Sequence, residues 1–254
     1  MSSAELIKCS SLNFSYIKNS LIIKDLNLSV HEGEFVGLVG ESGCGKSTLA
    51  ALLLNLIKPT SGSITVNNKD LSKLNKKEKK DFYRQVQIVF QDPSSSLDDL
   101  MSVGTLIEEP LKIHKIGNKV TRIEKVKSTM KLVGLSSAYI SSYPNELSGG
   151  LKQRLSIAIA LVLEPKILIL DECVSALDVS IQAQILNLLL DLQKRLKLTY
   201  LFITHDLNVV SYISDTIIVM KNGEIVEEGK CEDVFQHPQQ PYTKELLSSG
   251  ITNV

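Results

Sequence analysis

The spacing of apolar residues changes several times along the chain. Near the N-terminus, apolar and polar residues alternate in LIKCSSLNFSY and in IIKDLNLSVHEGEFVGLVG, which is typical of β-strands. The run Thr48–Ile57 (TLAALLLNLI) has a continuous apolar face of helical length and predicts a helix. SGSITVNN predicts a short strand, LNKKEKKDFYRQ a charged and solvated helix, and Val86–Phe90 (VQIVF) a buried strand. The chain therefore opens β-rich and continues as an α/β protein.

Residues 92–163 have a helical pattern in which β-branched strand runs disappear. Core patterns resume with KILILDE, SIQAQILNLLLDLQKRL and TYLFIT, and the Asn222-Gly223 pair in IIVMKNGEIVEEG suits the type I′ turn of a hairpin. CEDVFQHPQQPYTKELLSS predicts short helices split by prolines. The predicted parts are an α/β core of residues 1–91 and 164–230, an inserted helical subdomain of residues 92–163, and a tail of residues 231–254.

Charge and hydropathy narrow the class of partner. Lys+Arg and Asp+Glu both number 28, so the chain has no overall positive field to collect nucleic acid, and we expect no nucleic-acid partner. Spanning a bilayer takes about 20 consecutive apolar residues. No run approaches that length, and MSSAELIKCS does not resemble a signal peptide. We expect a soluble chain that needs a partner for any work at a membrane.

The four cysteines are scattered along the chain at Cys9, Cys44, Cys173 and Cys231. They form no C-x-x-C pair, which argues against a disulfide framework and against a structural zinc site. We expect reduced thiols.

The stretch GESGCGKST matches the phosphate-loop pattern G-x-x-x-x-G-K-[ST], with a predicted strand before it and a predicted helix after it. Its glycines let backbone amides curl around phosphates, Lys46 is expected to reach the β- and γ-phosphates, and Ser47 is expected to ligate Mg²⁺. The loop residues expected to bind nucleotide are Gly40, Ser42, Gly43, Cys44, Gly45, Lys46, Ser47 and Thr48.

Polar groups follow three buried strands. Asp171 and Glu172 end ILILDE, where Asp171 can hold Mg²⁺ through water and Glu172 can polarise an attacking water. His205 follows LFIT and could contact a γ-phosphate, although alone it would be read as a surface histidine. Gln91 follows VQIVF and could sense Mg²⁺, although alone it would be read as a loop glutamine. The expected catalytic residues are Glu172, His205, Lys46 and Gln91, and the expected metal ligands are Ser47, Gln91 and Asp171.

A second glycine-rich helix start, LSGGLKQR, provides backbone amides at Ser148, Gly149 and Gly150. In order and spacing, GESGCGKST, Gln91, LSGG, ILILDE, SALD and His205 resemble the nucleotide-binding subunit of ABC transporters over essentially the whole chain. The resemblance implies the ABC ATPase fold, which is an α/β P-loop core with an N-terminal antiparallel β part and an inserted helical subdomain. It also implies that Tyr16 stacks on adenine, that Ser175–Asp178 is the D-loop with Asp178 at the nucleotide, and that His205 is the switch histidine.

Members of this family work as head-to-tail dimers, so the resemblance implies that each ATP lies between the phosphate loop of one subunit and the LSGG of the other. ATP binding closes such a dimer, hydrolysis reopens it, and the motion passes to membrane subunits.

Four segments are similar to the oligopeptide, dipeptide and nickel importer group: YPNELSGG, SALDVSIQAQILNLL, FQDPSSSLDDLMSV and HPQQPYTKELL. Long members of that group continue into a cysteine-containing extension, whereas this sequence ends at Val254 with no cysteine after Cys231. This favours a short nickel-type subunit whose cargo is a metal, a metal chelate or a small peptide.

The same resemblance implies a set of partners. We expect a second ATPase subunit in a heterodimer, with a homodimer left open, two membrane permeases, and indirectly an extracytoplasmic solute-binding protein. The permeases are expected to contact the region Gln91–Val103, so the chain is expected at the cytoplasmic face of the membrane.

Two residues depart from the family pattern: Leu151 replaces the usual Gln of the signature, and Cys173 replaces the usual Pro after the catalytic Glu. We hypothesise that the site completed by this LSGGL is the weaker of two. Two alternative functions are open: a ribosome- or DNA-associated ABC ATPase, and an exporter or lipoprotein-release ATPase. About a hundred residues between the two glycine motifs leave no room for the coiled coil of DNA-associated types, and the HPQQPYT ending opposes the exporter.

Overall fold

A computed structural model of the protein describes residues 4–18 and 20–250. Its contacts divide into two compact units, which we describe separately. The first comprises Met1–Lys79 and Lys197–Val254, and the second comprises Lys80–Leu196. The division of the core at residues 91 and 164 stays a prediction.

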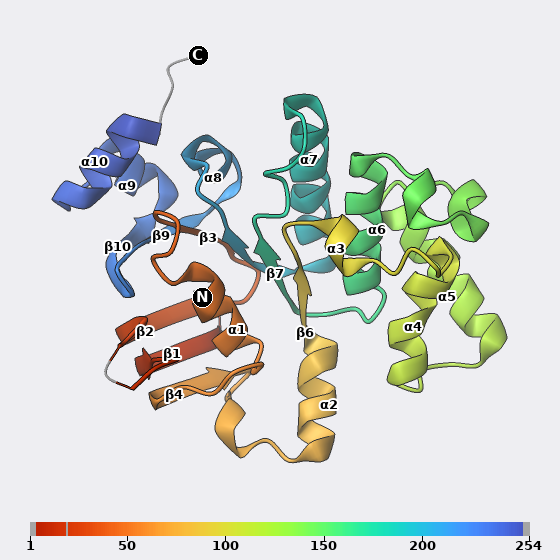
Figure 1. Ribbon diagram of the computed structural model, residues 1–254, viewed down its shortest axis with the longest axis horizontal. Coiled ribbons are helices and arrows are strands. Elements are labelled where there is room, and N and C mark those ends of the chain that lie inside the picture. Colours follow the sequence, from red (N-terminus) through yellow and green to blue (C-terminus); the bar gives the residue numbers. More distant parts are fainter. Residues whose placement is uncertain (1–3, 19, 251–254) are drawn as a thin grey trace. The chain divides into compact units, whose positions relative to one another are not determined.

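The first unit contains two groups of paired strands (Figure 1). Its strands are β1 (Glu5–Phe14), β2 (Ile23–His31), β3 (Phe35–Val39), β4 (Ser61–Val66), β5 (Lys69–Asp70), β8 (Thr199–Ile203), β9 (Thr216–Lys221) and β10 (Glu224–Lys230). Its helices are α1 (Lys46–Leu53), α8 (Leu207–Ile213), α9 (Cys231–Gln236), α10 (Pro241–Gly250) and the 3-10 turn η1 (Leu71–Lys73). Helix α2 (Lys76–Gln85) begins in this unit and continues into the second.

The N-terminal strands form an antiparallel sheet in the order β2-β1-β4-β5. The alternating pattern predicts strands here, and the antiparallel arrangement is the one that the family resemblance implies. Cys9 of β1 lies opposite Leu28 of β2 and Ile64 of β4, and all three are buried. Because side chains alternate between the faces of a strand, the apolar positions of β2 share one buried face.

The other paired strands of this unit run β10-β9-β3-β8. Strand β3 pairs in parallel with β8 and with β9. Every residue of β3 and β8 is buried, which explains their unbroken apolar runs. The rings of Phe35 and Tyr200 meet edge to face with centroids 4.7 Å apart. These strands form the core that carries the loop after β3.

Strand β10 returns antiparallel to β9 through a two-residue turn, because Lys221 pairs with Glu224. Asn222 and Gly223 have φ values of 50° and 88°, and two positive φ values define the predicted type I′ turn. The tail forms α9 and α10 with Pro238 between them, as its prolines predict. Both predictions are confirmed.

The second unit is mainly helical. Its helices are α3 (Pro93–Ser96), α4 (Val103–Ile113), α5 (Lys119–Leu132), α6 (Gly149–Leu161), α7 (Val179–Leu196) and the 3-10 segments η2 (Ser137–Ser141) and η3 (Pro144–Glu146). Its strands β6 (Val86–Val89) and β7 (Ile167–Asp171) pair in parallel. Within the described residues between 92 and 163 there are helices and no strand, as the pattern predicts, and α4, α5 and α6 lie together in Figure 1.

Two predicted element ends are wrong. Helix α1 ends at Leu53 and not at Ile57, because Asn55 adopts a positive φ of 53° while Leu56 N–H donates to the Ala51 carbonyl. This is a Schellman cap, which stops a helix even where apolar residues continue. Strand β6 ends at Val89, and the side chain of Phe90 is 47% exposed.

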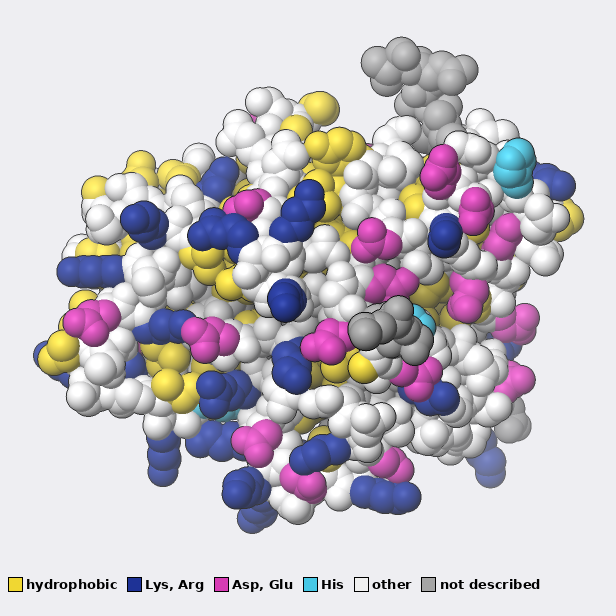
Figure 2. All heavy atoms as spheres, turned by 180° about the vertical axis from the view of Figure 1, so that it is seen from behind, with side chains coloured by type: hydrophobic (Ala, Val, Ile, Leu, Met, Phe, Trp, Pro, Cys, Tyr) yellow, Lys and Arg dark blue, Asp and Glu magenta, His cyan; other side chains and the backbone are white. Residues whose placement is uncertain are grey.

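Both signs of charge share the surface. In Figure 2, Lys and Arg side chains share the visible face with Asp and Glu side chains. Several are paired, such as Lys69 with Glu78 at 3.3 Å and Arg195 with Asp191 at 3.1 Å. Exposed pairs of this kind contribute about 0–1 kcal/mol each to stability. In the part of the chain that the structure describes, no helix combines the length and the apolar character needed to cross a membrane.

Candidate functional site

The phosphate loop connects β3 to α1, and its glycines adopt conformations that other residues rarely take. Gly40 has φ +153°, and a Cβ there would lie 2.1 Å from the Met220 carbonyl oxygen. Gly45 has φ +111° and is the N-cap of α1, with no side chain capping the helix. Gly43 has φ +80°, and nothing lies within 4 Å of where its Cβ would be. The N-cap of α1 therefore contributes no side chain to the amides of the first turn.

Lys46 lies inside this loop with its side chain folded back over it. Its Nζ donates to the carbonyl oxygens of Gly40 at 2.7 Å and Glu41 at 2.9 Å, and the residue is only 6% exposed. A buried ammonium group beside the amides of a helix N-terminus is a donor set that suits phosphate oxygens. The loop therefore fits the phosphates of a nucleotide.

Cys44 lies in the same loop and is buried, with its Sγ 3.8 Å from Lys46 Nζ. Burial raises the pKa of the Cys44 thiol above its ordinary value, and the neighbouring Lys46 charge opposes that shift only in part. The thiol is therefore neutral at physiological pH.

His205 lies at the same sheet edge as the phosphate loop. Strands β3 and β8 run parallel with Leu38 opposite Ile203, and Thr204 N–H donates to the Leu38 carbonyl at 3.2 Å. His205 follows directly and is exposed. The next residue, Asp206, caps α8 by accepting from two of its backbone amides. The cap fixes the chain direction just after the histidine.

In the second unit, the parallel strands β6 and β7 bring their polar ends together. Val89 lies opposite Leu170, and two residues further on Gln91 Nε2 donates to Glu172 Oε2 at 3.0 Å. Asp171 is the last residue of β7. Glu172 has φ 47°, a left-handed conformation that is uncommon for a residue with a side chain and that is often found at functional sites. The carboxylate of Glu172 thus accepts a hydrogen bond from the Gln91 amide just after the end of a buried strand.

Cys173, the residue that departs from the family pattern, is buried directly after Glu172. Burial raises the pKa of its thiol to about 12, so it carries no charge. It packs as a small apolar residue.

The LSGG stretch forms the start of α6. Ser148 is the N-cap in an extended conformation, and its side chain makes no hydrogen bond to the helix. A Cβ on Gly150 would lie 2.7 Å from Ile181 Cγ2, so α7 packs too close for a larger residue. Leu151 is half-buried. The start of this 13-residue helix therefore also lacks a side-chain cap.

Asp178 caps α7, because its Oδ1 accepts from Ile181 N–H at 2.9 Å. Ser175 is tied back to Glu172, whose carbonyl accepts from both the Ser175 N–H at 3.1 Å and its hydroxyl at 2.9 Å. The first residue of the predicted D-loop is therefore held by two hydrogen bonds to the backbone of Glu172, the candidate catalytic residue. A nucleotide contact of Asp178 stays a prediction.

Tyr16 follows β1 and is 64% exposed. Its ring stands edge to face on Phe14 with centroids 4.7 Å apart. An exposed aromatic ring held by a buried one offers a stacking surface, which suits the predicted contact with a base.

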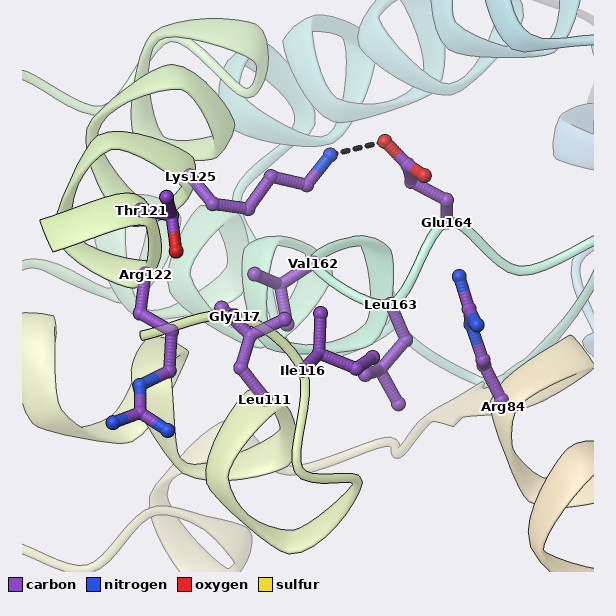
Figure 3. A pocket seen from close by; sticks show the side chains of 10 residues that line it. All are labelled: Arg84, Leu111, Ile116, Gly117, Thr121, Arg122, Lys125, Val162, Leu163 and Glu164. Atoms are coloured by element: carbon purple, nitrogen blue, oxygen red, sulfur yellow. Dashed lines mark hydrogen bonds and ion pairs between the residues drawn. The ribbon is translucent and has the colours of Figure 1, made fainter. Parts of the chain in front are cut away.

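A cavity of about 260 Å³ lies in the second unit (Figure 3). Its apolar wall includes Leu111, Ile116 and Leu163. Lys125 and Glu164 point toward each other and form an ion pair at its rim. It contains none of the predicted site residues, and no sequence pattern indicates it.

Two further contacts, which no sequence pattern indicates, hold the phosphate loop. Gly223 N–H, in the β9–β10 turn, donates to the Cys44 carbonyl at 2.9 Å. Tyr242, in the tail, contacts Glu41 of the loop. The PYT segment, which contains Tyr242, marks the family and does not by itself indicate this contact.

The fold and this loop define a P-loop nucleotide-binding protein. Residues 23–175 match the family model described as "ABC transporter". The chain belongs to the ABC transporter family and is an ATP-hydrolysing subunit, as the motifs predict.

Known proteins agree with this assignment. The chain is 46% identical to the oligopeptide transport ATP-binding protein OppF of Streptococcus mutans, over 96% of this chain and 80% of that protein. Its fold is similar to that of cbiO1 from Clostridium perfringens, described as part of the ABC transporter complex cbiONQ. The TM-score is 0.84 at 31% identity, covering 92% of this chain and 91% of that one.

It is also similar to the dimeric, post-hydrolysis structure of the ATP-binding cassette MJ0796 bound to ADP and Pi. That TM-score is 0.79 at 31% identity, covering 89% of this chain and 99% of the other. The predicted ABC ATPase fold is confirmed.

Proposed function

We propose that the chain is the ATPase subunit of an importer whose cargo is a small peptide. The observation that carries ATP binding is Lys46, buried inside the phosphate loop with its ammonium group on two backbone carbonyls. Support for the cargo comes from the 46% identity to an oligopeptide transport protein over nearly the whole chain. Nickel or a metal chelate, the other cargo of the importer group that the sequence resembles, is the second candidate.

Within the loop, we assign the phosphates of ATP to the α1 amides and to Lys46. The hydroxyl of Ser47, the amide of Gln91 and the carboxylate of Asp171 are the proposed Mg²⁺ ligands, because hard oxygen donors suit that ion. Bound Mg²⁺ would neutralise phosphate charge. Tyr16 is assigned to the adenine ring.

Glu172 is the proposed general base. Its carboxylate can accept a proton from the attacking water, and the Gln91 amide holds one of its oxygens in place. His205 is assigned to the γ-phosphate because it lies at the loop's own sheet edge.

The uncapped start of α6 supports a role for LSGG in a dimer. We propose that Ser148, Gly149 and Gly150 bind the nucleotide of a second ATPase subunit, in a heterodimer or a homodimer. Leu151 makes this composite site the weaker one. The test replaces Glu172, or the corresponding glutamate of the second subunit, one at a time. Equal hydrolysis at both sites would contradict that asymmetry.

Two permeases and an extracytoplasmic binding protein complete the proposed importer, with the ATPase at the cytoplasmic face of the membrane. The test is to purify the tagged chain from native membranes and identify the proteins that accompany it. Two permeases and a second ATPase subunit are the expected companions. Recovery with ribosomes or DNA would instead support a non-transport ABC ATPase, and recovery with an exporter or a lipoprotein-release complex would support that alternative.

A further inference from the structure

The C-terminal tail contacts the phosphate loop directly. The backbone N–H of Glu41, in the loop, donates to the hydroxyl oxygen of Tyr242 at 3.3 Å. Tyr242 is the second residue of α10 and is only 7% exposed. Lys221 Nζ lies 4.1 Å from the centre of its ring, in a cation–π contact. Burial and the Lys221 contact therefore hold the ring in a position where its hydroxyl accepts a hydrogen bond from the loop.

The peptide group between Gly40 and Glu41 has a partner on each side. A trans peptide is planar, so its N–H and its carbonyl point in opposite directions. The N–H donates to Tyr242, and the Gly40 carbonyl accepts from Lys46 Nζ at 2.7 Å. Tyr242 and Lys46 therefore hold opposite sides of one peptide plane.

Gly40 itself does little to fix this plane, because glycine has wide conformational freedom. No other residue fits, since a Cβ would lie 2.1 Å from the Met220 carbonyl oxygen. The orientation of the Gly40 carbonyl thus depends on its contacts, and Tyr242 provides the one on the N–H side.

The start of α10 is itself anchored. The Glu227 carboxylate, on β10, accepts from the backbone N–H groups of Gln239 at 2.7 Å and Gln240 at 3.0 Å. Burial acts to raise the pKa of Glu227, but these two hydrogen bonds, the neighbouring Thr243 side chain and the Lys244 charge together leave the pKa below its ordinary value. The carboxylate is therefore charged at neutral pH and fixes the chain two residues before Tyr242.

We propose that Tyr242 is a positioning residue for ATP binding: by holding the Glu41 N–H, it orients the Gly40 carbonyl that places Lys46. The tail segment HPQQPYT then helps to hold the phosphate loop in its nucleotide-binding conformation. This inference rests on the proposed role of Lys46 in binding ATP.

The test compares Tyr242→Phe, which removes only the hydroxyl, with Tyr212→Phe on α8, whose ring is 60% exposed. Calorimetry gives the Kd of the full chain for ATP, and steady-state hydrolysis gives KM and kcat. One neutral hydrogen bond predicts that Tyr242→Phe binds ATP about threefold to tenfold more weakly. KM rises by the same factor, while kcat and the melting temperature stay at wild-type values. Tyr212→Phe matches wild type.

A second pair of variants tests the anchor. Glu227→Gln weakens the two backbone hydrogen bonds and is expected to weaken ATP binding in the same direction, whereas Glu228→Gln, one residue away and exposed, is expected to be neutral. Wild-type affinity in Tyr242→Phe would overturn the inference, as would a parallel fall of kcat and melting temperature. Wild-type chain that binds no ATP would overturn the proposed function together with this inference.

Discussion

Lys46 and Glu172 are the residues on which the proposed chemistry depends. Lys46 Nζ has three hydrogen-bond donors and uses two of them on loop carbonyls. Glu172 has one carboxylate oxygen on the Gln91 amide. The two residues serve different steps, because Lys46 contributes to binding and Glu172 to proton transfer.

Replacing Glu172 by Gln removes the proposed base while keeping the side chain's size. ATP hydrolysis is expected to fall by about 10²–10⁴-fold, the usual contribution of a general base. ATP binding, measured by calorimetry, is expected to stay at wild-type strength. Asp191→Asn, at an exposed ion pair on α7, is the control. Near-normal turnover in Glu172→Gln would contradict the assignment.

The Cys44 thiol gives a pH-dependent test of the loop. Its raised pKa leaves little reactive thiolate at pH 7, so alkylation by a maleimide is expected to be slow there and to accelerate as the pH rises through and beyond the ordinary thiol range. Modification is expected to block ATP binding, and bound ATP is expected to protect the thiol. Mass spectrometry follows the reaction at Cys44. Modified protein that binds ATP normally would show that the loop is placed wrongly.

At the scale of elements, caps decide where helices begin and end. Apolar periodicity correctly located α1, but it could not find where this helix ends, because Asn55 closes a Schellman cap inside an apolar run. The start of α5 at Lys119 depends on Asn118, whose side chain accepts from Val120 and Thr121 N–H groups. Helix ends are set by a few hydrogen bonds of this kind, which periodicity does not register.

Asn118→Ala removes the cap of α5 and is expected to lower the free energy of unfolding by about 1 kcal/mol. The hydrogen bonds that the Asn118 side chain accepts from two backbone N–H groups, at 2.9 and 3.1 Å, are lost together. Urea unfolding followed by circular dichroism measures the change. Lys119→Ala, at the next residue, is the control and is expected to stay within about 0.5 kcal/mol of wild type. Equal stability of the two variants would contradict the capping role.

Sequence patterns indicate some of the contacts between the candidate site residues and miss others, for physical reasons. Buried parallel strands deliver their next residues to one edge, so the meeting of Gln91 and Glu172 followed from two apolar runs. The same logic brought His205 to the edge of the phosphate loop. The contact of Tyr242 with Glu41 joins residues 201 positions apart, and no local pattern indicates it.

At the scale of the whole molecule, membership of the ABC transporter family connects the nucleotide site to transport. The chain carries equal numbers of basic and acidic residues, 28 each, and belongs to the ABC transporter family. Its cargo is chosen outside the ATPase in the proposed importer, because the permeases and the binding protein contact the solute. Sequence similarity therefore indicates the cargo only through relatives such as OppF.

The most direct test is uptake by the purified complex. The complex that accompanies the tagged chain is reconstituted in liposomes with its binding protein, and labelled peptide and labelled nickel are offered separately with ATP. The proposed importer function predicts that peptide accumulates, that nickel does not, and that Glu172→Gln abolishes accumulation while ATP still binds. ATP hydrolysis by the complex with no uptake of peptide would contradict it.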